Sequence, residues 1–263
     1  MENENYSSLL VEYVIFNFQL SIFNSMPIPR TTTVCLRNAV IARDIWEFRL
    51  RKPEGFAFKA GQFVLFDVPL VDAPSDVQTR AFSIASAPGE KELLFVAKMK
   101  EGGRASRWIA EVLKEGTPVT LQGPFGAFVL HPENPRDIVM IATSTGIAPF
   151  RSQLHDLLTS NDARRIDLLF CVRSEEDLFW VEELESLAQH HERFTVHVTL
   201  SGGSPSWKGH RGRVQSIAHT TIADIAARQV FICGNPQMTL ELKKICLEQW
   251  GMDKKDIHVE GYI

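Results

Sequence analysis

The pattern of apolar residues changes near residue 131, and this change constrains the fold more than any other feature of the sequence. Beyond residue 137, short apolar runs alternate with segments of helical length. Strands are expected at residues 138–142, 166–172, 194–200, 230–233 and 257–260, and helices at residues 149–158, 175–190 and 236–250. Because strands that alternate with helices form a parallel sheet, we predict an α/β domain with a doubly wound parallel sheet over residues 132–263.

Residues 31–131 instead show short strand-like runs separated by turn signals, with one segment of helical pattern. Strands are expected at residues 31–42, 45–50, 62–68, 81–85, 93–99 and 118–122, and the helix at residues 106–113. Several short strands with a single helix predict a small antiparallel β-barrel. Pro132 and Pro135 mark the linker to the second domain.

Residues 1–30 follow neither pattern. Residues 9–23 are rich in apolar side chains, but Glu12, Asn17 and Gln19 interrupt them, and the run is shorter than the ~20 apolar residues of a membrane span. The acidic start differs from the basic start of a secretory signal. We expect an N-terminal extension that is not a membrane span, either native or added by a translation start placed upstream of Met26.

The composition of the 263 residues is that of a globular protein, with 44% hydrophobic and 23% charged residues. A net charge of −4 argues against nucleic-acid binding, which requires a basic face. The four cysteines, Cys35, Cys171, Cys233 and Cys246, form no CxxC pair, so neither a zinc nor an iron–sulfur site is expected. Their scattered positions are typical of the reducing cytoplasm.

The first motif is Arg80-Ala81-Phe82-Ser83-Ile84-Ala85-Ser86, which alternates small and apolar residues with one arginine and two serines. The planar arginine fork suits a phosphate, and a serine hydroxyl can both donate to and accept from the edge of a heteroaromatic ring. An ordinary strand with one salt bridge would show the same pattern. This motif alone therefore leaves both interpretations open.

The second motif, Gly102-Gly103-Arg104-Ala105-Ser106, stands directly before the helix of the barrel domain. Its glycines allow the backbone to approach a ligand closely, and Ser106 is expected to cap the helix, whose free amides favour an anion. A plain glycine turn with a serine cap is the alternative. Together with Arg80, the motif favours a diphosphate site.

Two further motifs follow strands of the second domain. Thr143-Ser144-Thr145-Gly146-Ile147-Ala148-Pro149 leads from a strand into a helix, where a parallel sheet binds a dinucleotide, although it has a single glycine. Cys233-Gly234-Asn235-Pro236-Gln237-Met238 also follows a strand, and Gly234 opens that strand end to a ligand. Cys171 has no such glycine turn after it and is interpreted as a core residue.

These motifs, followed by Glu260-Gly261-Tyr262, stand in the order seen in the ferredoxin–NADP reductase family, which the sequence resembles from about residue 31 to its end. Gly61-Gln62 and Gly123-Pro124-Phe125-Gly126 resemble that family too. The resemblance implies a barrel domain that holds FAD and a second domain that holds NADPH or NADH. It implies an oxidoreductase that transfers hydride between NAD(P)H and flavin.

On the flavin side, the resemblance implies that Arg80 binds phosphate and that Ser83 forms a hydrogen bond near flavin N5. Phe82 would replace the family's usual tyrosine against the isoalloxazine, without its hydroxyl. The pyrophosphate would be held by Gly103, Arg104, Ala105 and Ser106, and further cofactor contacts would come from Ala81, Ala97 and Lys98.

On the nicotinamide side, Cys233 and Glu260 would flank the ring, and Tyr262 would stack on the flavin as a gate that nicotinamide displaces. In the family this tyrosine is often the last residue, whereas Ile263 follows it here. The catalytic set is therefore Ser83, Cys233, Glu260 and Tyr262. The dinucleotide would contact Thr145, Gly146, Ile147, Ala148, Pro149, Gly234, Asn235, Pro236 and Met238.

The choice between NADPH and NADH depends on charge at the strand ends. An acidic residue after the second strand of the sheet would bind a ribose 2′-hydroxyl and favour NADH, but that strand ends at Arg173. Ser201 ends the next strand and is followed closely by basic residues, and such residues suit a 2′-phosphate: Lys208, His210, Arg211 and Arg213. The sequence favours NADPH, although Glu175 and Glu176 stand near enough to Arg173 to neutralise it.

The closely spaced cysteines of a fused ferredoxin do not occur in the sequence, so the electron acceptor is expected to be a separate protein, ferredoxin or flavodoxin first. An oxygenase component or free flavin is the alternative, and a non-catalytic flavin-binding adaptor is the alternative of another class. Basic clusters at residues 49–52 and 98–100 are either docking sites for an acidic partner or solvated faces.

Overall fold

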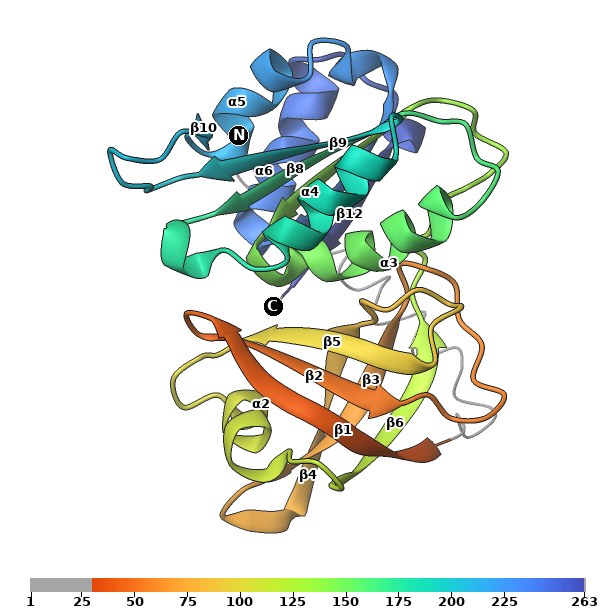
Figure 1. Ribbon diagram of the computed structural model, residues 1–263, viewed down its shortest axis with the longest axis vertical. Helices are drawn as coiled ribbons and strands as arrows, with labels where there is room; N and C mark the ends of the chain where they lie inside the picture. The colour runs from red at the N-terminus through yellow and green to blue at the C-terminus, as the bar shows by residue number, and fades with distance from the viewer. Residues whose placement is uncertain (1–29, 263) are drawn as a thin grey trace, which may run out of the picture.

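The computed structural model describes residues 30–262 (Figure 1). Two domains lie one above the other in this view, with the first sheet below and the second sheet and its helices above. The expectations for the N-terminal extension, including Met26, concern residues outside the described range. No helix within residues 30–262 is long and apolar enough to cross a membrane.

The first domain is a six-stranded antiparallel sheet in the order β4-β3-β6-β1-β2-β5, curled around an aromatic core. Its strands are β1 (Arg30–Ala42), β2 (Ile45–Arg51), β3 (Phe63–Leu70), β4 (Ala73–Ser83), β5 (Glu92–Lys98) and β6 (Pro118–Phe125). Phe48, Phe66 and Phe95 are fully buried, with ring centroids between 4.9 and 6.0 Å apart. The predicted domain of short antiparallel strands is confirmed.

β4 is longer than predicted, because it begins at Ala73 instead of residue 81. The added residues pair with β3 but are mostly exposed and polar, so they carry no apolar period that the sequence could reveal. The helix also begins early, as α2 (Arg104–Arg107) followed by the π-helical turn η1 (Trp108–Val112). Gly103 is its N-cap residue, so the expectation that Ser106 caps the helix is wrong.

The second domain is a six-stranded parallel sheet in the order β10-β9-β8-β7-β11-β12, which confirms the predicted parallel arrangement. Its strands are β7 (Ile138–Thr143), β8 (Ile166–Val172), β9 (Phe194–Leu200), β10 (His210–Arg211), β11 (Gln229–Gly234) and β12 (Ile257–Gly261). Its helices are α3 (Ala148–Leu158), α4 (Val181–His190), α5 (Val214–Thr221) and α6 (Pro236–Glu248), with short turns η2 (Ser144–Ile147), η3 (Glu175–Asp177), η4 (Ile225–Ala227) and η5 (Lys254–Asp256).

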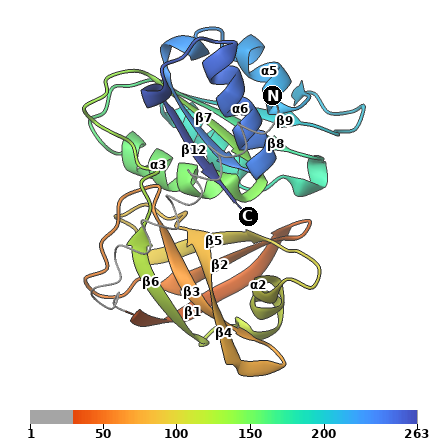
Figure 2. The same ribbon diagram turned by 180° about the vertical axis from the view of Figure 1, so that it is seen from behind.

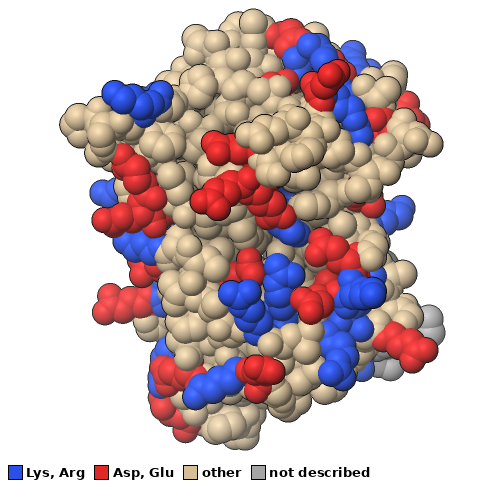
Figure 3. All heavy atoms as spheres, in the orientation of Figure 1, with Lys and Arg blue, Asp and Glu red and all other residues tan. Residues whose placement is uncertain are grey.

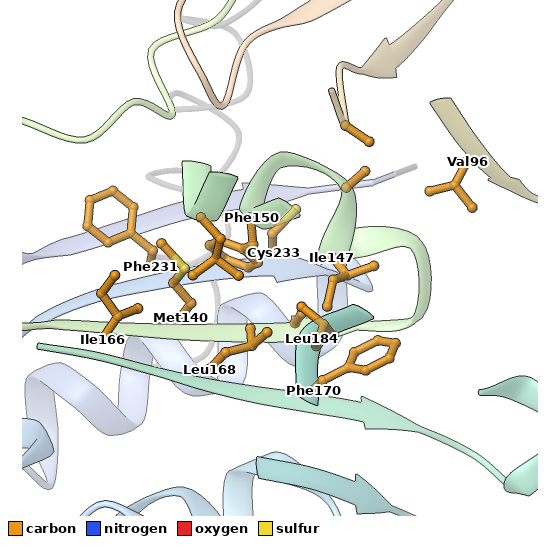
Figure 4. Packing of buried hydrophobic residues seen from close by; sticks show 14 of the residues in the cluster. Val96, Met140, Ile147, Phe150, Ile166, Leu168, Phe170, Leu184, Phe231 and Cys233 are labelled. Carbon is orange, nitrogen blue, oxygen red and sulfur yellow. The ribbon is translucent and has the colours of Figure 1, made fainter. Parts of the chain in front are cut away.

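Helices cover both faces of this sheet, α3 and α4 on one side and α5 and α6 on the other (Figures 1 and 2). Alternate residues of β7 pack on opposite faces of the sheet. Met140 belongs to the apolar cluster with Phe150 of α3, and Ile141 belongs to the cluster with Leu242 of α6. The cluster on the α3 side also contains Val96 of the first domain (Figure 4). One apolar cluster therefore crosses the domain boundary.

The single helix predicted at residues 175–190 is wrong, because the chain is interrupted there. Ser174 and Asp177 form a capping box around η3, and Trp180 takes a left-handed conformation with φ of 56°. α4 then begins at Val181. β10 and α5 were not predicted, since only Val214 and Ala218 of α5 are buried and this leaves a weak apolar stripe.

Candidate active site

A cavity of about 610 Å³ lies at the carboxyl ends of the parallel strands, next to β7, where the strand order reverses. Open α/β sheets bind their ligands at this position. The first domain contributes Lys98, from the end of β5, to its lining. Eight of the predicted site residues line the cavity: Lys98, Thr145, Arg173, Ser201, Gly234, Asn235, Met238 and Tyr262.

Two glycines let the turns after β7 and β11 come together. A Cβ atom on Gly146 would lie 2.4 Å from the carbonyl oxygen of Cys233, and one on Gly234 would lie 2.1 Å from Thr143 Oγ1. Gly234 also has a φ of 140°, which side chains rarely adopt. Asn235 N donates to Thr143 Oγ1 at 3.1 Å, while the Asn235 side chain caps α6. Both predicted glycines therefore fix the floor of the cavity.

The four residues predicted to be catalytic meet where the two domains touch. Ser83 ends β4 of the first domain, while Cys233 and Glu260 are paired neighbours on β11 and β12. Tyr262 OH donates to Ser83 Oγ at 2.9 Å, and Ser83 Oγ donates to Glu260 Oε1 at 3.2 Å. Tyr262 N is also bound to the Gly234 carbonyl oxygen at 2.9 Å. Two hydrogen bonds in series thus run from Tyr262 through Ser83 to Glu260 across the domain boundary.

Burial sets the ionisation of this group. It raises the pKa of Glu260 to about 7, against the opposing hydrogen bond from Ser83. Burial, followed by the charge of Glu260, raises the pKa of the Cys233 thiol well above its ordinary value, so the thiol stays protonated at neutral pH. Cys233 is therefore a neutral, close-packed side chain and not an activated nucleophile.

Two residues predicted on the flavin side, Arg80 and Arg104, are both connected to β4: Arg80 belongs to β4, and Arg104 binds Asp76 of β4. Arg80 donates to the Thr79 carbonyl oxygen at 2.8 Å and to Gln78 Oε1 at 2.7 Å, and among the described residues it has no carboxylate partner. Arg104 donates to both the carbonyl oxygen and the carboxylate of Asp76, at 2.7 and 2.8 Å. Both guanidinium groups therefore lie along one strand. Arg80 and Arg104, which directly follows Gly103, each present a planar fork of the kind that binds phosphate.

Other flavin-side positions have structural contacts of their own. Ser106 Oγ accepts a hydrogen bond from Lys100 N at 2.8 Å, which closes the loop before α2. The ring of Phe82 packs against Phe66 and Phe48, at centroid distances of 5.2 and 5.7 Å, and stays partly exposed. One side of this ring is therefore held by the core, and the other can meet a ligand.

The residues predicted for a 2′-phosphate are only partly brought together. Arg173 and Ser201 line the cavity, whereas Arg211 lies outside its lining and donates to the carbonyl oxygens of Gly203 and Trp207. Arg213 lines the cavity in its place. Arg213 was among the basic residues expected to suit a 2′-phosphate, and it directly precedes α5.

The acidic residues beside Arg173 are engaged elsewhere. Glu175 accepts hydrogen bonds from Ser204, and Glu176 pairs with Arg43 at 2.7 Å. Neither neutralises Arg173. Ile147, Ala148, Pro149 and Ala97 are buried and lie outside the cavity lining, as do the more exposed Ala81, Ala105 and Pro236.

Comparison with known proteins agrees with this geometry. A family model described as an oxidoreductase FAD-binding domain matches residues 34–130, and one described as an oxidoreductase NAD-binding domain matches residues 140–244. Ferredoxin–NADP reductase B of Sorangium cellulosum is 36% identical over 80% of this chain and 87% of its own length. The phenol 2-monooxygenase reductase component DmpP of a Pseudomonas species is 32% identical over 78% of this chain but only 58% of its own length.

Solved structures show the same arrangement. The Amycolatopsis cytochrome P450 reductase GcoB has a TM-score of 0.79 and 26% identity, covering 90% of this chain and 71% of its own. A Neisseria gonorrhoeae ferredoxin NADP⁺ reductase with bound FAD and NADP has a TM-score of 0.74 at 23% identity, over 88% of this chain and 98% of its own, and so shares the fold. The chain belongs to the ferredoxin–NADP reductase family of oxidoreductases, with an FAD-binding domain followed by an NAD(P)-binding domain.

Proposed function

We propose that this chain transfers hydride between NADPH and bound FAD and passes the electrons to a separate acceptor, ferredoxin or flavodoxin first. The observation that carries the proposal is the contact of Ser83 with Glu260 and Tyr262 across the domain boundary, directly beside the cavity. When bound, FAD supplies the centre that accepts a hydride, two electrons with one proton, from the reduced nicotinamide.

The chain's own residues prepare this site. The Ser83 hydroxyl is held from both sides, since it accepts from Tyr262 and donates to Glu260. Displacement of the Tyr262 ring frees one side of the hydroxyl for a ligand. Glu260, with a pKa of about 7, can take up or release a proton there near neutral pH. Cys233 fills the space below them without charge.

NADPH is proposed over NADH because Arg173, Ser201 and Arg213 line the cavity and none is paired with a carboxylate within residues 30–262. A guanidinium group binds a phosphate through paired, charge-assisted hydrogen bonds. A ribose 2′-hydroxyl offers no such charge. The 2′-phosphate of NADPH would therefore bind a cationic site that NADH, which lacks this phosphate, would leave unused.

An electron-transfer protein is proposed as the acceptor on the strength of the relatives' names. Figure 3 shows basic and acidic side chains intermixed over the first domain, without a large patch of one sign. Within the cluster at residues 49–52, Arg49 pairs with Glu47 and Glu92. Lys98 and Lys100 are exposed and Lys98 lines the cavity, so we propose that the acceptor docks beside them.

A second candidate function is the reductase component of an oxygenase. The naphthalene 1,2-dioxygenase reductase component of Pseudomonas putida is 29% identical over 83% of this chain, and the chain spans 65% of its length. Steady-state reduction of purified ferredoxin by NADPH, measured from 20 to 300 mM salt, tests the acceptor. Fast reduction that weakens with salt supports ferredoxin. Reduction of free flavin alone supports a flavin reductase, and no turnover with bound FAD supports the adaptor.

We also propose a cytoplasmic location, because the four cysteines are all buried and free. Reducing compartments keep thiols in this state. Cell fractionation with an antibody against the chain tests the location, and recovery with an extracytoplasmic fraction would contradict it.

A further inference from the structure

Arg151, near the start of α3, is a buried cation that the proposed chemistry does not use. Only 6% of it is exposed. Its Nη1 donates to the Ala85 carbonyl oxygen at 2.9 Å and to Glu90 Oε1 at 3.2 Å. Nε and Nη2 donate to the Glu183 carboxylate at 3.1 and 2.6 Å. Nearly the whole donor fork is thus occupied by partners from both domains.

The surroundings of Arg151 keep it charged and fixed. Its guanidinium carbon lies 5.5 Å from the ring centroid of Trp180, and His155 Nε2 lies 2.8 Å from Glu183 Oε1, the oxygen that also accepts from Arg151 Nη2. Burial opposes the charge, but the hydrogen bond and charge of Glu183 outweigh it and raise the pKa of Arg151. Removal of one member of such a buried network leaves its partners unsatisfied, so the geometry is strongly determined.

The two residues after Arg151 bind the first domain as well. Ser152 Oγ donates to the Ser86 carbonyl oxygen at 2.6 Å, and Gln153 Nε2 donates to the Phe128 carbonyl oxygen at 2.7 Å. Three consecutive side chains of α3 therefore bind main-chain oxygens of the first domain. We call residues 151–153 the α3 clamp.

The α3 clamp joins the two halves of the active site by very short stretches of chain. Ala85 and Ser86 follow Ser83 by two and three residues. On the other side, α3 continues directly from η2, the turn that contains Thr145 of the cavity lining. A change at the clamp is therefore transmitted to the flavin-side strand and to the nicotinamide-side turn.

We propose that the α3 clamp sets the separation between the Ser83 strand and the Thr145 turn, and so the distance over which hydride passes. Arg151 and Ser152 are positioning residues in this view, because they act through their neighbours. The inference rests on the proposed function. Hydride transfer needs reacting atoms about 3–3.5 Å apart, and a misplacement of ~1 Å can slow it ~100-fold.

The effect of removing any contact between the domains must be distinguished from the effect of changing the hydride-transfer distance. Arg43 provides the matched control, since it crosses the same boundary and binds Asp177 and Glu176 at 2.7 Å each. It lies in the turn between β1 and β2, and none of its partners adjoins Ser83 or Thr145 in the chain. Arg43→Met therefore removes an ion pair across the same boundary, more exposed than that of Arg151, away from Ser83 and Thr145.

The test uses the full chain loaded with FAD, as wild type, Arg151→Met, Arg151→Lys and Arg43→Met. Anaerobic stopped-flow mixing with NADPH and with its 4-deuterated form gives the rate of flavin reduction and its isotope effect. NADP⁺ titration gives the dissociation constant and the long-wavelength absorbance of nicotinamide stacked on flavin. We expect Arg151→Met to slow reduction at least ~10-fold, with a larger isotope effect, weaker long-wavelength absorbance and an NADP⁺ affinity within about twofold of wild type.

In Arg43→Met, the flavin should be reduced at the wild-type rate. The rate for Arg151→Lys should lie between those of wild type and Arg151→Met, because lysine keeps the charge but lacks the planar fork. Equal rates for Arg151→Met and wild type, or equal slowing in Arg151→Met and Arg43→Met, would overturn the clamp. If Arg151→Met does not fold, Ser152→Ala takes its place, with at least ~3-fold slowing expected and an unchanged rate contradicting the inference. Wild-type flavin that neither NADPH nor NADH reduces would instead overturn the proposed function, and the clamp with it.

Discussion

The ionisation of Glu260 links the stability of this chain to pH. Its pKa is about 7 in the folded protein, against an ordinary value of 4.5, because it is buried beside Ser83. Between these values the folded state holds a proton that the unfolded chain has released. The contribution of Glu260 to stability is therefore greatest below about pH 4.5 and is lost as pH rises to about 7.

Glu260→Gln should remove this pH dependence, since glutamine mimics the protonated acid. Urea unfolding at pH 5.0 and 7.5, without added nucleotides, measures it. The variant should lose less stability than wild type between the two pH values. Equal losses in the two proteins would show that Glu260 is ionised in the folded state. Turnover of the loaded variant should fall more than its nicotinamide affinity.

Tyr262 is predicted to limit access of nicotinamide to the flavin. Its main chain stays bound to Gly234 when the side chain is removed, so Tyr262→Ser should alter the ring site alone. We expect NADP⁺ to bind about 2- to 10-fold more tightly, because an aromatic stack of about 0.5–1.5 kcal/mol no longer has to be displaced. Product release should slow, and the preference for NADPH over NADH should relax.

Tyr262→Phe is the matched control, since it removes only the hydroxyl that donates to Ser83. An absorbance titration with NADP⁺ compares the three proteins. Unchanged affinity in Tyr262→Ser, together with an unchanged flavin spectrum and turnover, would leave Tyr262 as a packing residue.

Arg213 should account for much of the selectivity for NADPH. It lines the cavity with Arg173, whereas Arg211 is bound by the carbonyl oxygens of its own loop. Arg213→Ala should raise the KM for NADPH about 10-fold or more, as expected for the loss of a charge-assisted hydrogen bond of about 1.5–3 kcal/mol, with little change for NADH. Arg211→Ala is the control, and a larger effect there would reverse the assignment.

At the scale of elements, the β3–β4 hairpin and α2 are joined by two ion pairs. Asp76 pairs with Arg104 at 2.8 Å, and Asp72 pairs with Arg107 at 2.6 Å. Only the first pair engages a residue proposed to hold the FAD pyrophosphate. The Asp76 carboxylate therefore competes with the cofactor for one guanidinium group.

Asp76→Asn should weaken that competition and tighten FAD binding several-fold, on the scale of a partly exposed ion pair of about 0.2–1 kcal/mol. Asp72→Asn, which changes the neighbouring pair, should bind FAD as wild type does. Quenching of FAD fluorescence by the apoprotein measures both. Weaker binding in Asp76→Asn would mean that Asp76 orients Arg104 for the cofactor.

The elements that could be predicted from the sequence are those in which buried apolar residues recur at a regular spacing. β7 and β8 are runs of buried apolar residues, and β2 alternates buried and partly exposed positions. Residues 73–80 of β4 follow no such pattern, because their place is set by pairing with β3. The four positions proposed to be catalytic were predicted from motif order. Arg151 was not, because its partners Ala85, Glu90 and Glu183 lie far from it in the chain and one of them is a main-chain oxygen, which no side-chain pattern reveals.

At the scale of the whole molecule, the active site depends on how the two domains are held together. The apolar cluster that contains Met140 and Phe150 also contains Ile45, Leu94 and Val96 of the first domain. Trp180 Nε1 donates to Glu47 Oε2 at 2.8 Å across the same boundary. Burial of such a cluster stabilises one relative placement of the domains. That placement brings Ser83 to Glu260.

Anaerobic mixing of FAD-loaded protein with NADPH tests whether hydride passes from NADPH to FAD at this boundary. The purified chain should take up FAD and be yellow. Its absorbance near 450 nm should bleach on addition of one equivalent of NADPH, faster than on addition of NADH. A chain that takes up no FAD, or whose bound flavin stays oxidised with both nucleotides, would contradict hydride transfer from NADPH at this boundary.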